Sequence, residues 1–379
     1  MHEGTSARRS ALWFAFLLAP AAALCLAAGC RPTPQIPAAD RPQAVPMTSA
    51  EPANAYAGDR ECADCHPREY RLHQAGRHSK TMYAGSRSAL GKLAPPPGPI
   101  GDTGYVVRYE GDKMLFARDD GSESAEVARV LGSGKTGLTF LARFGPDSFT
   151  ELRMSYFPLE KRWYTTPGQE GKEDLALGME HRGRLARRCL GCHSSTQPAP
   201  TPLPDPRHFG VQCESCHGPG YAHVKSARAG RVETELNIER TTALSGPQKD
   251  ALCAKCHRAA HDVSLVTLEL TATGRFQPYG LTFSACYRKS NGKLTCLTCH
   301  DPHRDAETSE SYYERICLAC HTPAASAKIR GNAQKPAVCP VNREKGCIPC
   351  HMPKHDILPG SDIQVKMADH FIWATRKPR

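Results

Sequence analysis

Seven short segments of this chain repeat one arrangement of reactive side chains, in which two cysteines are separated by two residues and followed at once by a histidine. This arrangement is the attachment signature of a c-type haem, because the two thiols add to the porphyrin vinyl groups and the imidazole binds the iron from one face. The attaching thiols are Cys62 and Cys65, Cys189 and Cys192, Cys213 and Cys216, Cys253 and Cys256, Cys296 and Cys299, Cys317 and Cys320, and Cys347 and Cys350. The proximal ligands are His66, His193, His217, His257, His300, His321 and His351. The sequence therefore predicts seven covalently bound haem c groups.

Paired cysteines have two other common uses. Zinc sites also draw on Cys-x-x-Cys units, but they combine four ligands from two units and do not require a histidine after every second cysteine. Disulfide frameworks are typical of short secreted chains, whereas this chain has 379 residues. Because every Cys-x-x-Cys pair here is followed by histidine, haem attachment is the better interpretation.

The second axial position of each iron decides between electron transfer and catalysis, since a six-coordinate iron holds no substrate and a five-coordinate iron can. Nine histidines outside the motifs and the N-terminal leader are candidate distal ligands: His73, His78, His181, His208, His223, His261, His303, His355 and His370. This supply allows every iron to be bis-histidine. Met82, Met154 and Met367 could contribute thioether ligands instead, although we interpret them mainly as packing residues.

Three of these histidines follow a motif closely, His261 and His355 by four residues and His303 by three. A second ligand to the same iron must come from the opposite face of the porphyrin, which three or four residues cannot reach. If these histidines bind iron, they bind that of a neighbouring haem, and close haem packing becomes part of the fold. The alternative for each is a hydrogen bond to a propionate or simple exposure.

Cys286 and Cys339 lie in the body of the chain but outside the motifs. An oxidising compartment allows them to pair, and the disulfide would close a loop of about fifty residues and contribute roughly 4 kcal/mol. A thiolate ligand to an iron is the second possibility. The sequence leaves this choice open.

The polypeptide that positions these groups is poor in large apolar side chains, with aromatic residues at 7% of the chain. Haems are large apolar discs, so seven of them would form much of the interior. We predict a mostly α-helical and irregular, haem-packed multihaem cytochrome fold, in which short helices carry the motifs and long connections join them. The apoprotein is not expected to fold.

The long interval between the first and second motifs contains strand signals. Residues 105–109 alternate, a turn follows at Gly111, and residues 113–118 continue the pattern, which predicts a β-hairpin. Two further strand-like runs at 138–144 and 149–156 flank a Gly-Pro-Asp turn. We therefore predict a small antiparallel β insertion at about 103–166, in the N-terminal half.

The N-terminus has the form of an export signal. Arg8 and Arg9 precede an apolar run that ends in Ala-Ala-Gly before Cys30, which is typical of a secretory signal peptide over residues 1–29. The segment Ala27-Ala28-Gly29-Cys30 resembles a bacterial lipobox, so Cys30 is the candidate lipid-anchored first residue. We expect an exported protein, periplasmic or on the outer surface, held to a membrane through Cys30. A retained membrane helix is the alternative.

The motif spacing predicts the organisation of the rest of the chain. A Pro- and Ala-rich tether covers residues 30–56. A one-haem N-terminal region with the β insertion then covers 57–184, and a six-haem domain covers 185–379.

The formal net charge of +11 does not indicate nucleic-acid binding. Loss of the leader and addition of seven haems with their propionates leave about +3 in the oxidised holoprotein and about −4 in the reduced one. The arginines are therefore better explained as propionate partners or solvated surface. No nucleotide site is expected either, because Arg129 stands where a phosphate-binding loop ending in Gly134-Lys135-Thr136 needs its first glycine.

Segments around the motifs resemble those of the multihaem cytochromes related to cytochrome c-552/c-554. These are GDRECADCH at 58–66 with RHSKTM at 77–82, GVQCESCHGPG at 210–220, LTCLTCHDPH at 294–303 and CIPCHMP at 347–353, together with 154–158 and 167–168. The resemblance covers about residues 57–379. It implies a periplasmic or surface electron carrier with stacked haem pairs, in which the positions of His78 and His303 are distal ligands.

Three functions fit this sequence. The first is an electron carrier that passes electrons between redox partner proteins through mostly bis-histidine haems. The second is an oxidoreductase with one open haem that acts on small nitrogen or sulfur compounds; no Cys-x-x-Cys-Lys motif occurs, and Tyr221, Tyr312 and Tyr313 are candidates for a tyrosine crosslinked to haem. The third is a haem-based sensor, for which no effector domain is visible. We favour the carrier and assign no catalytic residue, because there are enough histidines to give every iron a second axial ligand and leave no position for substrate.

Overall fold

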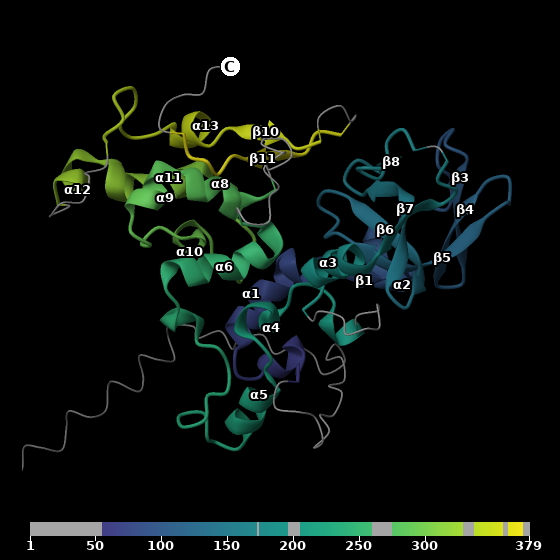
Figure 1. Ribbon diagram of the computed structural model, residues 1–379, viewed down its shortest axis with the longest axis horizontal. Coiled ribbons are helices and arrows are strands. Elements are labelled where there is room, and N and C mark those ends of the chain that lie inside the picture. The colour runs from purple at the N-terminus through teal and green to yellow at the C-terminus, as the bar shows by residue number, and fades with distance from the viewer. Residues whose placement is uncertain are drawn as a thin grey trace, which may run out of the picture. The chain divides into compact units, whose positions relative to one another are not determined.

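A nine-stranded antiparallel sheet is built mainly from the residues between the first two motifs. The computed structural model describes residues 55–172, 174–195, 205–259, 275–328, 337–358 and 363–373 (Figure 1). The strands are β1 Met82–Ala84, β2 Gly98–Pro99, β3 Tyr105–Glu110, β4 Lys113–Arg118, β5 Ser124–Leu131, β6 Leu138–Gly145, β7 Ser148–Phe157, β8 Arg162–Thr165 and β9 Gly178–Arg182.

Most strands of this sheet pair with the next strand along the chain, from β2 to β8, while β1 pairs with β5 and β9 pairs with β7. Strand β5 changes partner along its length: its first half pairs with β4 and its second half with β1. Register shifts interrupt the ladders between β5 and β6 and between β6 and β7. Because such bulges bend a strand and increase its twist, they account for the curl of the sheet.

The predicted fold, mostly α-helical and irregular with a small β insertion at about 103–166, is wrong about the sheet. The sheet is large and curled, and it extends from β1 to β9. The runs predicted at 105–118, 138–144 and 149–156 do form β3, β4, β6 and β7, but β1, β2 and β9 lie outside the predicted range. These three strands are short, and they become strands by pairing with β5, β3 and β7, which sequence periodicity does not reveal.

The sheet has an apolar core of its own. Phe116, Phe140, Leu138 and Leu152 are completely buried within one cluster of sheet residues. Burying a side chain of this size contributes about 1.5–3 kcal/mol relative to leaving it exposed. In this part of the chain the polypeptide itself therefore supplies the interior.

The rest of the described chain consists largely of short helices, several of which carry the motifs. Helices α3, α6 and α11 end at a motif histidine, and α4 and α13 coincide with motifs. The helices are α1 Pro67–Ala75, α2 Arg87–Leu90, α3 Gly183–His193, α4 Cys213–His217, α5 Tyr221–Arg228, α6 Gly246–His257, α8 Gln277–Phe283, α9 Ala285–Lys289, α10 Cys296–Cys299, α11 Glu310–His321, α12 Pro323–Lys328 and α13 Cys347–His351. None of the helices in the described ranges is long and apolar enough to cross a membrane.

Contacts between helices bring the motifs into a series. Helix α6 contacts α3 and α10, and α11 contacts α10 and α13. Helix α6 begins at a capping box of Ser245 and Gln248 with Pro247 in its first turn, which fixes where this motif helix starts. Two short antiparallel strands, β10 Lys354–Asp356 and β11 Lys366–Ala368, follow the last motif.

Several predictions fall on residues that the structure does not describe. The signal peptide at 1–29, Cys30, the tether up to residue 54 and His261 all lie outside the described residues. Residues Met47–Arg379 cluster as one unit. The boundary between a one-haem region ending at 184 and a six-haem domain beginning at 185 stays a prediction.

Candidate haem-binding site

Residues from all seven motifs line one continuous cavity of about 2490 Å³. A pocket for one small ligand usually measures about 300–1,000 Å³, so this space suits several large groups. The motif thiols and imidazoles at its walls are the donors that c-type haem requires. The cavity therefore fits a set of closely packed haems.

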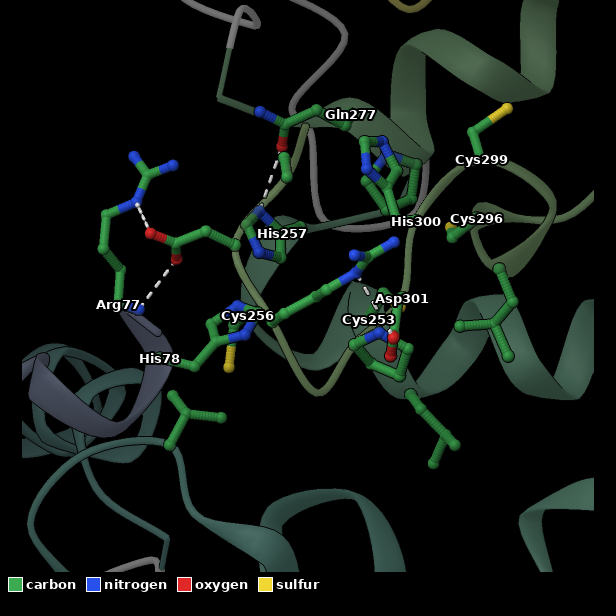
Figure 2. A pocket seen from close by; sticks show the side chains of 18 of the residues that line it. Arg77, His78, Cys253, Cys256, His257, Gln277, Cys296, Cys299, His300 and Asp301 are labelled. Carbon is green, nitrogen blue, oxygen red and sulfur yellow. Dashed lines mark hydrogen bonds and ion pairs between the residues drawn. The ribbon is translucent and has the colours of Figure 1, made fainter. Parts of the chain in front are cut away.

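Within the described residues, four motif imidazoles each face an imidazole from elsewhere in the chain. The distance between ring centroids is 6.5 Å for His66 and His223, 6.4 Å for His217 and His303, 6.2 Å for His257 and His78, and 6.3 Å for His300 and His370. Figure 2 shows the third pair, with the His257 ring between His78 and Gln277. Each pair joins residues far apart in the sequence, so only the tertiary fold brings them together.

The separation sets these pairs apart from ordinary ring packing. The other ring contacts of the described residues have centroid distances of 5.0–5.9 Å, all shorter. Two metal–imidazole bonds of about 2.0 Å, each extended by about 1.1 Å to the ring centre, predict about 6.2 Å between imidazoles on opposite sides of one iron. All four pairs fit that requirement.

Hydrogen bonds at Nδ1 leave Nε2 as the nitrogen with a free lone pair. Such bonds orient an imidazole and fix its tautomer for metal binding. The Nδ1 partners are Thr81 O for His193 at 2.9 Å, Ala337 O for His321 at 2.7 Å, Trp373 O for His351 at 2.5 Å, Gln277 Oε1 for His257 at 3.0 Å, Leu236 O for His223 at 2.6 Å and Ala368 O for His370 at 3.0 Å.

Burial keeps several of these imidazoles neutral. Removal from water is the main cause that lowers the pKa of His78, His193, His217, His257 and His300, and it lowers the pKa of His370 to about 4. A neutral imidazole has no proton to lose before it binds a metal. The site is therefore prepared for iron at neutral pH.

The other described histidines of the predicted set do not face a motif imidazole. His181 Nε2 lies 3.0 Å from Glu151 Oε2, and His355 Nε2 lies 3.4 Å from Asp369 Oδ2. The ring of His208 contacts that of Tyr56. His73 is buried, which lowers its pKa to about 4.

Three motif histidines have no second imidazole opposite them within the described residues: His193, His321 and His351. His261, the ninth candidate, lies outside those residues. The described part of the chain therefore contains a second imidazole for some of the irons and not for all.

Buried carboxylates connect successive motifs. Asp250 in α6 accepts a hydrogen bond from the backbone N–H of Cys296 at 2.8 Å, and Glu314 in α11 accepts one from the backbone N–H of Cys347 at 2.9 Å. Both N–H groups begin a motif helix and would otherwise lack a helical partner. Each acid lies three residues before the first cysteine of its own motif. The same device thus links the fourth motif to the fifth and the sixth to the seventh.

Contacts between thiols give the order in which the attachment sites lie. Cys62 of the first motif and Cys213 of the third share a hydrogen bond, which raises the pKa of the Cys62 thiol and lowers that of the Cys213 thiol. The same kind of contact joins Cys253 to Cys296 and Cys192 to Cys256. The fourth motif therefore contacts both the second and the fifth.

The remaining sulfur atoms divide between packing and the cavity. Met82 and Met154 are buried in the apolar clusters of the sheet region, which agrees with a packing role. Met367 lines the cavity. Cys286 and Cys339 are both free thiols that also line the cavity.

Sequence reasoning missed the groups that support the ligands. Gln277 contacts His257, and the buried Glu214 accepts hydrogen bonds from Ala57 and Gly58 N–H, both at 2.8 Å. Backbone carbonyl acceptors leave no sequence signal. An acid stands three residues before the first, fourth, sixth and seventh motifs, at Asp59, Asp250, Glu314 and Glu344, and this is a signal that could have been found.

Residues 160–218, which contain the second and third motifs, match the family described as "Cytochrome c554 and c-prime". Together with the repeated attachment motif, this match identifies the chain as a multihaem c-type cytochrome. Proteins of this class bind haem c covalently and transfer electrons through it.

A more particular likeness is to the multiheme cytochrome MtrA of Shewanella baltica, which is 24% identical over 176 residues. The match covers 46% of this chain and 43% of that protein, so the chain spans less than half the length of this curated relative.

Two solved structures are also similar. The undecaheme cytochrome from the S-layer of Carboxydothermus ferrireducens matches with a TM-score of 0.43 and 18% identity, covering 80% of this chain and 51% of that one. The outer cell wall cytochrome OcwA matches with a TM-score of 0.47 and 14% identity, covering 84% of this chain and 79% of that one.

Proposed function

We propose that this chain is an exported heptahaem electron carrier, located in the periplasm or at the cell surface, that passes electrons between redox partner proteins. The observation that carries the proposal is the set of four imidazole pairs at 6.2–6.5 Å, which is the separation that two ligands of one iron require. A closed iron exchanges electrons and excludes substrate. In this proposal His223, His303, His78 and His370 are the distal ligands of the first, third, fourth and fifth haems.

The contacts between motifs support a continuous path for electrons. The thiol contacts link the first motif to the third and the fourth to both the second and the fifth. Lys255 of the fourth motif donates a hydrogen bond from Nζ to Ser215 O of the third at 3.3 Å, which joins the two groups. Helix contacts extend the series from α10 through α11 to α13. Electrons would therefore pass along the later motifs, with the second haem as a side branch beside the fourth.

The proposed location depends on the N-terminal sequence. The predicted signal peptide at 1–29 would deliver the chain across a membrane, where haem attachment takes place, and Cys30 would carry a lipid anchor. The Pro-rich tether that follows would hold the haem-bearing part away from the bilayer.

Two measurements on the protein purified from the cell envelope test the proposal. Intact mass should show seven covalent haem increments, and electron paramagnetic resonance of the oxidised protein should show predominantly low-spin iron. Fewer than seven increments would refute the proposed loading. Predominantly high-spin iron would refute the closed ligand sets.

A second candidate function is supported by His193 and His351, which face no second imidazole within the described residues. An iron left open at either position could bind a small nitrogen or sulfur compound. Near His193 the charge of Arg275 adds to the effect of burial in lowering the histidine pKa, and such a cation could attract an oxyanion. A haem propionate would satisfy Arg275 equally well.

Carbon monoxide separates the two functions. The carrier should not bind it, because that function requires a second ligand on every iron. Spectral change in one or two haems on addition of carbon monoxide or nitrite, together with a high-spin signal, would favour the oxidoreductase. Replacing Arg275 with Gln would then weaken nitrite binding but not carbon monoxide binding, because only nitrite is charged.

A further inference from the structure

The thiol of Cys286 lies against the proximal histidine of the sixth motif. Its Sγ is 3.8 Å from Nε2 of His321. The Nδ1 of the same imidazole is bonded to Ala337 O at 2.7 Å, so Nε2 is the nitrogen available for iron. Cys286 therefore stands on the iron-binding side of His321, where four other motif histidines have an imidazole.

The distance agrees with a shared metal. A metal–imidazole bond of about 2.0 Å and a metal–thiolate bond of about 2.3 Å place the two donor atoms about 4.3 Å apart on opposite sides of a metal. The observed distance is about half an ångström shorter than that value, which a small rotation of the cysteine side chain would supply. Cys286 is half-buried and lines the same cavity as the motifs.

We propose that Cys286 is the distal ligand of the sixth haem, which makes this haem a histidine–thiolate centre among histidine–histidine centres. On ligation the Cys286 thiol gives its proton to solvent and the sulfur lone pair forms the bond to ferric iron, with no change of oxidation state. The inference depends on the proposed haem loading at Cys317 and Cys320.

The other free cysteine does not fit this role as well. Cys339 lies two residues after Ala337, which contacts the Nδ1 side of His321. Its Sγ accepts the backbone N–H of Asn342 at 3.4 Å. Cys339 is therefore the matched control for Cys286.

A thiolate ligand has a consequence for the sixth haem. It donates more electron density to iron than imidazole does and cancels the positive charge of the ferric centre, so it favours the oxidised state. We expect this haem to have the lowest reduction potential of the set. Lying between the fifth and seventh haems in the series, it would act as an energy barrier to electrons rather than as a storage site.

The test is electron paramagnetic resonance of the oxidised holoprotein, with the haem number of every variant counted by intact mass. The wild type should show one low-spin signal with the narrow spread of g values typical of thiolate ligation, beside the broader bis-histidine signals. Cys286→Ala should lose that signal alone and keep its haem number. Cys286→His should convert it to a bis-histidine signal and shift one reduction step to higher potential. Cys339→Ala should retain it.

Three results would overturn the proposal: a wild type without the narrow signal, a Cys286→Ala protein that keeps it, or loss of the signal in Cys339→Ala. Alkylation of the unreduced protein is an additional check, since a disulfide between the two cysteines would block both and exclude thiolate ligation. Missing haem mass at Cys317 and Cys320 would instead refute the proposed loading, which separates failure of the ligand assignment from failure of the proposed function.

Discussion

The sheet region and the motif-bearing helices obtain their interiors from different sources. In the sheet, Phe116, Phe140, Leu138 and Leu152 are completely buried against one another. The motif helices instead surround a cavity of about 2490 Å³ and contribute few large side chains that are completely buried. Because hydrophobic burial provides most of the free energy of folding, the sheet can be stable on its own residues while the helices depend on haem.

Omission of haem is expected to have the largest effect on this contrast. In protein made without haem attachment, hydrogen exchange should show protected amides in β3 to β7 and nearly complete exchange in α4 to α13, because the helices are short and lack their interior. The holoprotein, in which both regions should be protected, is the control. Protected amides throughout α6, α10 and α11 in the apoprotein would contradict the comparison.

Truncation in the core of the sheet should destabilise the sheet and leave the haem-bearing helices unchanged. Phe140→Ala removes a completely buried ring and is expected to reduce the free energy of unfolding of the sheet by about 3–5 kcal/mol. The haem absorption of the folded protein should not change, because Phe140 contacts sheet residues. Denaturant unfolding followed separately by fluorescence and by haem absorption measures the two regions. A matched loss at both probes would show that the regions unfold as one.

Removal of a linking carboxylate should have a smaller effect that is confined to the helices. Asp250→Ala leaves the partly buried N–H of Cys296 without its acceptor, at an expected cost of about 1–3 kcal/mol. Asp112→Ala is the control, since this exposed carboxylate also accepts a backbone N–H, from Ser88 in the sheet region. Unfolding followed by haem absorption should detect the first substitution and not the second.

Removal of one distal ligand should have the smallest effect, because it changes the coordination of a single haem. His223→Ala is expected to convert one low-spin haem to a high-spin or solvent-ligated form, seen by electron paramagnetic resonance and by new binding of carbon monoxide. His181→Ala should leave the haem spectrum unchanged, because its Nε2 is bonded to Glu151. An unchanged spectrum in His223→Ala would remove this residue from the ligand set.

Local patterns were sufficient for part of the sheet and insufficient for its extent. The alternation at 105–118 and the runs at 138–144 and 149–156 correspond to β3, β4, β6 and β7. Strands β1 and β9 pair with β5 and β7, far away in sequence, and carry no alternation long enough to detect. Sequence periodicity reports which face of a strand is buried, and it cannot report a short strand that exists only because a partner is present.

The attachment chemistry follows from the sequence alone, because Cys-x-x-Cys-His places both thiols and the proximal imidazole within five consecutive residues. The count of histidines likewise bounded how many irons could be closed. Which histidine faces which motif was decided only by the tertiary structure, which brings His78 to His257 and Cys286 to His321. The physical reason is that a distal ligand must approach from the opposite face of the haem, and a neighbouring residue in sequence cannot reach that face.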